Sequence, residues 1–399
     1  MEIERILFMR NMEAKKPLGL YLHIPFCVQK CQYCDFLSGK GNREEMEAYV
    51  EALLKEICAY KTDQQNNISN FFVQTIYFGG GTPSILEAEA IRRLLDTIRA
   101  CFVVMPSAEI TLEVNPGTVT REKIRQYKEM GINRLSIGLQ SVREEELRLL
   151  GRIHTFSEFL DCFQMARQEG FTNISIDLIS GLPNQTKEQF LESLSVVASL
   201  GVEHISVYSL IIEEGTPFFE LYGEGGSRQN ELISEDLDRE FYELTKQMLA
   251  KAGYERYEFS NYAKVGYESK HNCSYWIGVD YLGLGLGASS YFCGSRFYNT
   301  RNRIEYNKNA EHLSLLRQEV QVLSEKERME EFMFLGLRLC KGVSKQEFAH
   351  RFHCEIEEIY GTVLKRLEKI GVLICTRDTI ALTDFGIDVS NQVLAEFLL

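Results

Sequence analysis

Six short apolar runs alternate with longer amphipathic segments over residues 18–212, and this alternation limits the fold more than any other feature. Near-continuous apolar strands separated by helical segments are typical of parallel β/α units, whose strands are buried on both faces. Eight such units would close a barrel. Six predict an α/β fold with a partial, open (β/α)6 TIM-like barrel. The runs are GLYLHI (19–24), TIYFGGG (75–81), EITLEVNP (109–116), RLSIGLQS (134–141), ISIDLISGLP (174–183) and HISVYSL (204–210).

The remainder of the chain has a different pattern. A polar, glycine-bearing stretch at 221–236 marks a boundary, and we expect a helix after it, at about 236–252. Residues 254–300 are rich in aromatics and glycine and predict an irregular region. Beyond about residue 320, two helical runs precede the alternating stretch VLICTRDTIALT, a predicted hairpin, which together favour a small, mainly helical, winged-helix-like domain. The predicted parts are a barrel (1–220), a connecting region (221–310) and a C-terminal domain (311–399).

Charge and hydropathy exclude some classes of function. The chain has 44 lysines and arginines against 57 acidic residues, a net charge of −13, which disfavours binding to nucleic acid. No apolar run approaches the roughly 20 residues that span a bilayer, and the N-terminal stretch MEIERILFMRNMEAKKPLG has no small-residue cleavage site. We therefore expect a cytoplasmic protein. Eight of its eleven cysteines are scattered and are expected to be small buried side chains.

The other three cysteines lie together in the stretch HIPFCVQKCQYCDF (23–36). Cys27, Cys31 and Cys34 have C-x3-C-x2-C spacing. Three thiolates on one loop can hold three corners of a cubane 4Fe-4S cluster and leave the fourth iron without a protein ligand. Structural zinc is an alternative, but it takes four ligands, so that His23 would have to supply the fourth. A redox dithiol of the last two cysteines leaves the first without a role.

The cysteine spacing, with Tyr33 before the third cysteine, resembles the signature of the radical S-adenosylmethionine superfamily. The longer string YLHIPFCVQKCQYCDF resembles the HemN/HemW family, which contains oxygen-independent coproporphyrinogen III oxidases and heme chaperones. The resemblance implies that S-adenosylmethionine binds the open iron through its amino and carboxylate groups. It also implies that an electron from the cluster cleaves the sulfonium of that molecule.

Glycines and polar residues at the ends of the predicted strands match family positions that contact S-adenosylmethionine. Glycines such as those of GGGTP (79–83) let a backbone approach a ligand closely. An arginine can bind a carboxylate through two parallel hydrogen bonds. Each residue alone would be an ordinary strand-end group. Because one follows almost every strand, they favour a site at the C-terminal edge of the barrel. The residues implied by the resemblance are Tyr21, Tyr33, Gly80, Gly81, Thr82, Glu113, Gln140, Arg152 and Asp177.

A second motif, HNCSYWIGVDYLGLGLGASSY (271–291), resembles a segment that is shared by the same family and linked there to heme binding. An imidazole can ligate heme iron, and an amide and two aromatic rings suit a flat macrocycle. Packing between domains is the alternative role, and Cys273 is a second candidate for an iron ligand. The residues implied by the resemblance are His271, Asn272, Tyr275 and Trp276.

Two features separate the branches of this family. The resemblance implies a fourth cysteine in the oxidases, two residues after the third, where this chain has Phe36; in addition, only 26 residues precede Cys27. Both departures favour the heme-chaperone branch, whose members bind heme and pass it to a target protein. Oxidative decarboxylation of coproporphyrinogen III is the alternative, so enzymatic activity stays open.

The resemblance also implies the partners. They are S-adenosylmethionine, heme or another tetrapyrrole, an electron donor and a heme-receiving protein. Any association with a membrane would arise through that receiving protein. Both a monomer and a dimer are compatible with the sequence.

Overall fold

All six predicted apolar runs are strands of one sheet, in which they lie in sequence order with parallel neighbours. The computed structural model describes residues 15–63 and 67–399. The six strands are β1 (Lys16–Ile24), β2 (Phe71–Gly80), β3 (Val104–Val114), β4 (Arg134–Gln140), β5 (Ile174–Ser180) and β6 (His204–Ser209). Within the described residues the two edges of the sheet do not pair with each other. The predicted α/β fold with an open, six-unit parallel barrel is confirmed.

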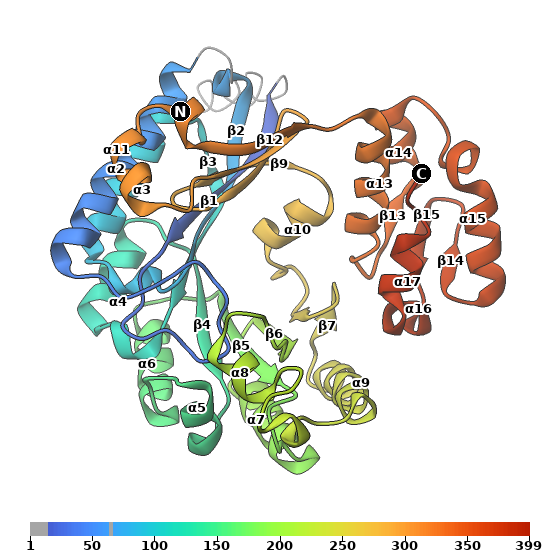
Figure 1. Cartoon of the computed structure of the whole chain (residues 1–399), viewed down its shortest axis with the longest axis horizontal. Coiled ribbons are helices and arrows are strands. Elements are labelled where there is room, and N and C mark those ends of the chain that lie inside the picture. The colour runs from blue at the N-terminus through green and yellow to red at the C-terminus, as the bar shows by residue number, and fades with distance from the viewer. Residues whose placement is uncertain (1–14, 64–66) are drawn as a thin grey trace.

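Helices lie between and after these strands in the chain, and most of them cover the outer side of the sheet (Figure 1), whereas α5 and α8 contact the loop that follows β1. They are α2 (Arg43–Thr62), α3 (Ala88–Cys101), α4 (Arg121–Glu129), α5 (Glu144–Leu150), α6 (Phe156–Gln168), α7 (Lys187–Ser199), α8 (Pro217–Tyr222) and α9 (Glu235–Lys251). Helix α3, for example, buries Ile91, Leu94 and Ile98, which share one face of a helix. Because the helices occupy the outer side, the C-terminal ends of the strands are left to carry loops.

The prediction of an irregular region at 254–300 is wrong, because short strands there extend both edges of the sheet. They are β7 (Glu255–Arg256), β8 (Asn261–Ala263), β9 (Asp280–Leu284), β10 (Ser289–Phe292) and β11 (Ser295–Asn299), and β12 (Arg317–Val322) follows them. Strand β9 is parallel to β1, with Tyr281 opposite Gly19, whereas β8 is antiparallel to β6. The resulting sheet has twelve strands. Strands β7 and β8 have two and three residues, too few to show an alternating pattern, and β9 to β11 have only four or five.

The C-terminal residues form helices around a small three-stranded sheet, at the right of Figure 1. The elements are α13 (Glu325–Gly336), β13 (Val343–Ser344), α14 (Lys345–Phe352), α15 (Ile356–Ile370), β14 (Leu373–Cys375), β15 (Thr379–Leu382), α16 (Asp384–Asp388) and α17 (Ser390–Ala395). The predicted hairpin is confirmed, since β14 and β15 are antiparallel with Ile374 opposite Ala381. This arrangement agrees with the predicted winged-helix-like domain.

Three short helices lie between the main sheet and the C-terminal elements in the chain: α10 (Lys270–Trp276), α11 (Arg303–Asn309) and α12 (Leu313–Leu316). Helix α10 contacts both β2 and α13, and Figure 1 shows it between the parallel strands and the C-terminal helices. The motif HNCSYW therefore lies between the main sheet and the C-terminal helices.

Two large hydrophobic cores are present in the described residues. The larger one fills the main sheet and extends along the chain to Leu316, whereas the second begins at Met329 in α13. The division of the chain into three parts, with boundaries at residues 220 and 310, stays a prediction. None of the helices described here has the length and apolar character needed to cross a membrane. Residues 1–14, on which the predicted lack of a cleavable leader partly depends, lie outside the described residues.

Candidate functional site

The cysteine motif lies on the loop that follows β1, at the C-terminal edge of the sheet. The base of the loop is closed by a hydrogen bond of 2.9 Å from the backbone amide of Cys27 to the carbonyl oxygen of Gly39. His23 holds the returning chain, because its Nε2 lies 2.8 Å from the carbonyl oxygen of Leu37. Its Nδ1 lies 3.1 Å from the hydroxyl of Tyr21. Both imidazole nitrogens are thus engaged within the protein, which leaves His23 poorly placed as a fourth zinc ligand.

The three thiols line one cavity of about 500 Å³, which we call the cysteine cavity. Cys27 is buried, and Cys31 and Cys34 are half-buried. Among the described residues, no three Cys, His, Asp or Glu side chains lie close enough to hold a single metal ion. A cubane makes no such demand, because each cysteine binds a different iron. A redox dithiol of Cys31 and Cys34 would leave Cys27, which lines the same cavity, without a role. The donor set therefore fits a cluster better than zinc or a dithiol.

The glycine turn after β2 packs directly against the cysteine loop. The amide of Gly81 donates to the carbonyl oxygen of Ile24 at 2.9 Å. A Cβ atom at Gly81 would lie 2.6 Å from the carbonyl oxygen of Phe26 and 2.9 Å from Sγ of Cys27, so only glycine permits this approach. The hydroxyl of Thr82 lies 3.6 Å from the same sulfur. The turn thus brings backbone atoms to the edge of the cysteine cavity.

Two half-buried carboxylates, Glu113 on β3 and Asp177 on β5, face the same cavity. Tyr77 donates to Glu113 at 2.8 Å, and Ser136 donates to Asp177 at 3.2 Å. Desolvation is the main cause that raises the pKa of both groups, to about 7 for Glu113. A nearby positive charge favours the ionised form of a carboxyl group. The pair is therefore suited to a cationic ligand.

Alternate residues of β4 line the cysteine cavity: Arg134, Ser136, Gly138 and Gln140. This is the period of two that a strand imposes on its side chains. Sequence reasoning identified only Gln140, although the same period identifies Arg134 and Ser136. Gln140 has a φ of +76°, a left-handed conformation that is uncommon for a residue with a side chain. Such strained residues cluster at binding sites.

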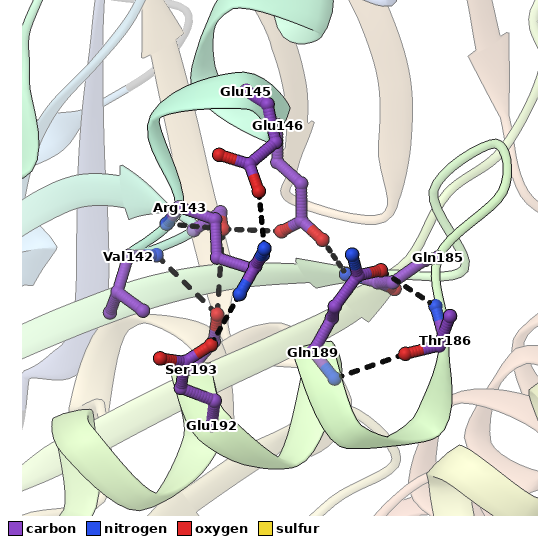
Figure 2. Close-up of polar contacts among 10 residues, drawn as sticks. Val142, Arg143, Glu145, Glu146, Gln185, Thr186, Gln189, Glu192 and Ser193 are labelled. Carbon is purple, nitrogen blue, oxygen red and sulfur yellow. Dashed lines mark hydrogen bonds and ion pairs between the residues drawn. The ribbon is translucent and has the colours of Figure 1, made fainter.

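A buried carboxylate holds the loop that follows Gln140 (Figure 2). Glu146 on α5 accepts hydrogen bonds from the hydroxyl of Ser141 and, at 3.1 Å, from Nε2 of Gln185. Ser193 on α7 also reaches this loop, because its Oγ lies 3.4 Å from Oγ of Ser141. The strained end of β4 is thereby tied to α5, to α7 and to the segment after β5.

Arg152, which follows α5, joins β4 to the cysteine loop. Its Nη2 donates to the carbonyl oxygen of Gly138 at 2.7 Å, and its Nη1 lies 3.5 Å from Sγ of Cys31. Its Nε is buried and has no hydrogen-bond partner in the described part of the chain. A guanidinium with an unused donor beside the thiols suits a carboxylate ligand.

Helix α10 lines both the cysteine cavity and a second cavity of about 990 Å³, and so does the cysteine loop, through Asp35 and Phe36. Asn272 lines the cysteine cavity, whereas Tyr275 and Trp276 line the second cavity. His271 lines neither: its Nδ1 lies 2.9 Å from the hydroxyl of Thr75 and its Nε2 lies 2.7 Å from the hydroxyl of Tyr275. Burial lowers its pKa to about 3. In this conformation His271 is a neutral packing group with no nitrogen available to iron.

The structure brings most of the predicted residues together. Every residue predicted to contact S-adenosylmethionine lines the cysteine cavity except Tyr21, which lines the second cavity. Cys273 lines neither cavity. Residues of the cysteine cavity that sequence reasoning missed include Asn115, Arg134, Ser136 and Ser206.

Comparison with known proteins identifies the family. The chain matches the family model of the Radical SAM superfamily over residues 21–197 and that of the HemN C-terminal domain over residues 323–389. It is 38% identical to the heme chaperone HemW of Lactococcus lactis, over 96% of this chain and 98% of that protein. The chain belongs to the HemW family. HemW of Bacillus subtilis is 36% identical over 95% and 98% of the two chains, and HemW of Escherichia coli is 42% identical over 68% and 69%.

The fold of this HemW-family chain is also found in a solved structure. Coproporphyrinogen III oxidase (HemN) from Escherichia coli, described as a radical SAM enzyme, matches with a TM-score of 0.81 over 98% of this chain and 92% of that one. The two sequences are 23% identical, so the match shows a shared fold.

Membership of the radical SAM superfamily implies a 4Fe-4S cluster and S-adenosylmethionine. The residues of this HemW-family chain fit both groups: three thiols on one loop face a cavity that also contains two desolvated carboxylates and an arginine with an unused donor. When bound, such a cluster supplies an electron to the sulfonium of S-adenosylmethionine.

Proposed function

We propose that this protein is a heme chaperone, which binds heme and passes it to a target protein. The observation that carries the proposal is the similarity to HemW heme chaperones over nearly the whole length of both chains. Phe36 supports it, because it stands where the resemblance to the oxidases requires a fourth cysteine. Its side chain is 60% exposed and lines both cavities.

In this proposal the cysteine cavity holds the cluster, on Cys27, Cys31 and Cys34, with S-adenosylmethionine beside it. The carboxylates of Glu113 and Asp177 balance the positive charge of that ligand, and their raised pKa values support the assignment, because a cation would restore their ionised form. Arg152 binds the carboxylate of the ligand through its unused donor. The remaining proposed contacts are Tyr33, Gly80, Gly81, Thr82 and Gln140.

Heme, in this proposal, contacts the residues of α10 that line the second cavity. Tyr275 and Trp276 supply aromatic rings there. Asn272 faces the cysteine cavity, and His271 fixes α10 on the sheet through Thr75. Tyr21 lines the second cavity beside them. The function requires a heme-receiving protein and an electron donor as partners, and we place it in the cytoplasm.

An anaerobic experiment tests the proposal against the oxidase alternative. Protein with a reconstituted cluster is titrated with hemin, and is separately incubated with dithionite, S-adenosylmethionine and coproporphyrinogen III. We expect saturable hemin binding and no release of carbon dioxide. Carbon dioxide release that depends on coproporphyrinogen III would establish the oxidase, and the lack of saturable hemin binding would refute the chaperone.

A further inference from the structure

The second cavity has the size, charge and ring content of a tetrapyrrole site. It lies between the cysteine loop, α10, strands β9–β11 and the C-terminal helices α13 and α14. We propose that heme binds in this cavity, with its propionates on Arg301 and Arg328 and its iron on His350. The inference rests on the proposed heme-binding function and gives it a location and ligands.

The charge of the second cavity is opposite to that of the whole chain. The cavity is lined by more cationic side chains than carboxylates, whereas the chain has a net charge of −13. A concave surface with one sign of charge concentrates ligands of the other sign. This cavity therefore favours a dicarboxylate. The cationic residues are Lys30, Arg296, Arg301, Arg328 and Arg351, and the acidic ones are Asp35 and Glu331.

Two of these arginines are available to a ligand. Arg296 is paired with Glu331 at 2.6 Å, and Arg351 is paired with a glutamate of its own helix. Arg301 and Arg328 are exposed, and neither forms an ion pair within residues 15–63 and 67–399. Arg301 follows β11 and Arg328 lies on α13, so the sheet and the C-terminal helices each provide one guanidinium group. Guanidinium groups bind carboxylates in a fork geometry.

Aromatic rings form two walls of the cavity. The rings of Tyr275 and Tyr281, from α10 and β9, meet edge to face with centroids 4.5 Å apart. From the C-terminal helices, Phe332 and Phe352 meet edge to face with centroids 5.8 Å apart. Ligand cavities are typically about 300–1,000 Å³ and mostly apolar. The second cavity, at about 990 Å³, suits a large ligand with apolar faces and charged substituents.

Two histidines line the second cavity, and they differ in availability. Both nitrogens of His23 are hydrogen-bonded, to Tyr21 and to the backbone at Leu37. His350, on α14, is exposed and has no hydrogen-bond partner among the residues that the structure describes. An imidazole with a free nitrogen is a common axial ligand of heme iron. The geometry therefore selects His350 over His23 and over His271.

The arginine assignment is tested by hemin titration of the full chain, followed by the Soret band. We expect the double variant Arg301→Gln/Arg328→Gln to bind hemin roughly tenfold to a hundredfold more weakly than the wild type. The control variant Arg125→Gln/Arg366→Gln loses the same charge at exposed sites outside the cavity and should match the wild type. Hemin dimethyl ester, which lacks the carboxylates, should bind the wild type and the double variant equally. Unchanged hemin affinity in the double variant would overturn this assignment.

The iron ligand is tested by the spectrum of hemin bound to His350→Ala. We expect the variant to lose the absorption and spin-state signature of imidazole ligation, and added imidazole to restore it. An unchanged spectrum would overturn the assignment of His350. The results also separate the inference from the function on which it rests. If the wild type does not take up hemin, the proposed function fails; if all variants bind hemin with the affinity and spectrum of the wild type, only the assignment of Arg301, Arg328 and His350 fails.

Discussion

The two cavities lined by α10 are built from opposite chemistry. The cysteine cavity combines thiols with the carboxylates Glu113 and Asp177, whose pKa values are raised by desolvation. The second cavity combines aromatic rings with an excess of arginines. A sulfonium compound is cationic and a heme with two propionates is anionic. The charge of each cavity would therefore direct each ligand to its own cavity.

The cavities also differ in how firmly their polar groups are held. In the cysteine cavity, Tyr77 and Ser136 fix the carboxylates, and Glu146 fixes the loop after β4. In the second cavity, Arg301 and Arg328 are exposed and without ion pairs in the described residues. Fixed groups suit a site that must position a reacting bond. Exposed, adjustable groups suit a site that must release its ligand.

Removal of one cluster ligand should produce the largest difference in effect between the two cavities. We expect Cys31→Ala to abolish incorporation of the 4Fe-4S cluster, because two thiols would leave two of the four irons without a protein ligand. Iron content and the iron–sulfur absorption band after anaerobic reconstitution measure this loss. Hemin affinity should stay at the wild-type value. Cys293→Ala is the control, because Cys293 is exposed and lines neither cavity. A loss of hemin binding in Cys31→Ala would show that the cavities are not independent.

Neutralising a carboxylate should weaken only the cationic ligand. We expect Asp177→Asn in cluster-loaded protein to bind S-adenosylmethionine roughly tenfold to a hundredfold more weakly, because a charge-assisted interaction is lost in a desolvated site. Equilibrium dialysis with labelled S-adenosylmethionine measures the affinity. Asp161→Asn, at an exposed position on α6, makes the same chemical change outside both cavities. Equal affinities in the two variants would remove Asp177 from the site.

The parallel strands and the cluster motif could be predicted because each depends on neighbouring residues. The run ISIDLIS is apolar enough to be a buried strand in any context, and C-x3-C-x2-C places three donors on one loop. Arg134 and Ser136 could also have been found, since they share one face of β4 with Gln140.

The second cavity could not be predicted in the same way. Its walls bring Tyr21 of β1 together with Tyr281 of β9 and Phe352 of α14, which are far apart in the sequence. The strand that makes this possible, β9, has only five residues, one of them glycine, and it is defined by its pairing with β1 and β10. The packing role of His271 stayed an open alternative, because its partner Thr75 lies on β2, 196 residues away in the chain.

Acidification should weaken the binding of S-adenosylmethionine. Desolvation, the largest cause, raises the pKa of Glu113 from 4.5 to about 7. A cationic ligand binds the ionised form, so its affinity should fall by up to about tenfold per unit as the pH drops below about 7, and should level off above. Stability without ligand should change in the opposite direction. Because the folded state holds this proton more tightly, the free energy of unfolding should fall as the pH rises from about 4.5 to about 7.

Glu56 offers a matched control for this pH dependence. Burial also raises its pKa to about 7, but its partners are Tyr306, Asn299 and the amide of Gly285, and it lines neither cavity. Glu56→Gln should alter the pH dependence of stability alone, whereas Glu113→Gln should also flatten the pH dependence of ligand affinity. An affinity profile that changed in Glu56→Gln and not in Glu113→Gln would contradict the assignment.

The smallest effect is expected from a residue that acts on the cysteine cavity only through a loop. In Glu146→Gln, one carboxylate oxygen becomes an amide that donates, so either Ser141 or Gln185 loses its acceptor. The loop that holds Gln140 in its left-handed conformation is then fixed less firmly. We expect roughly threefold weaker binding of S-adenosylmethionine, equivalent to about 0.7 kcal/mol, and unchanged hemin affinity. Glu145→Gln changes the adjacent residue, whose exposed carboxylate contacts Arg143, and should have no effect on either ligand. If both variants also bound hemin more weakly, the effect would come from lower overall stability rather than from the position of Gln140.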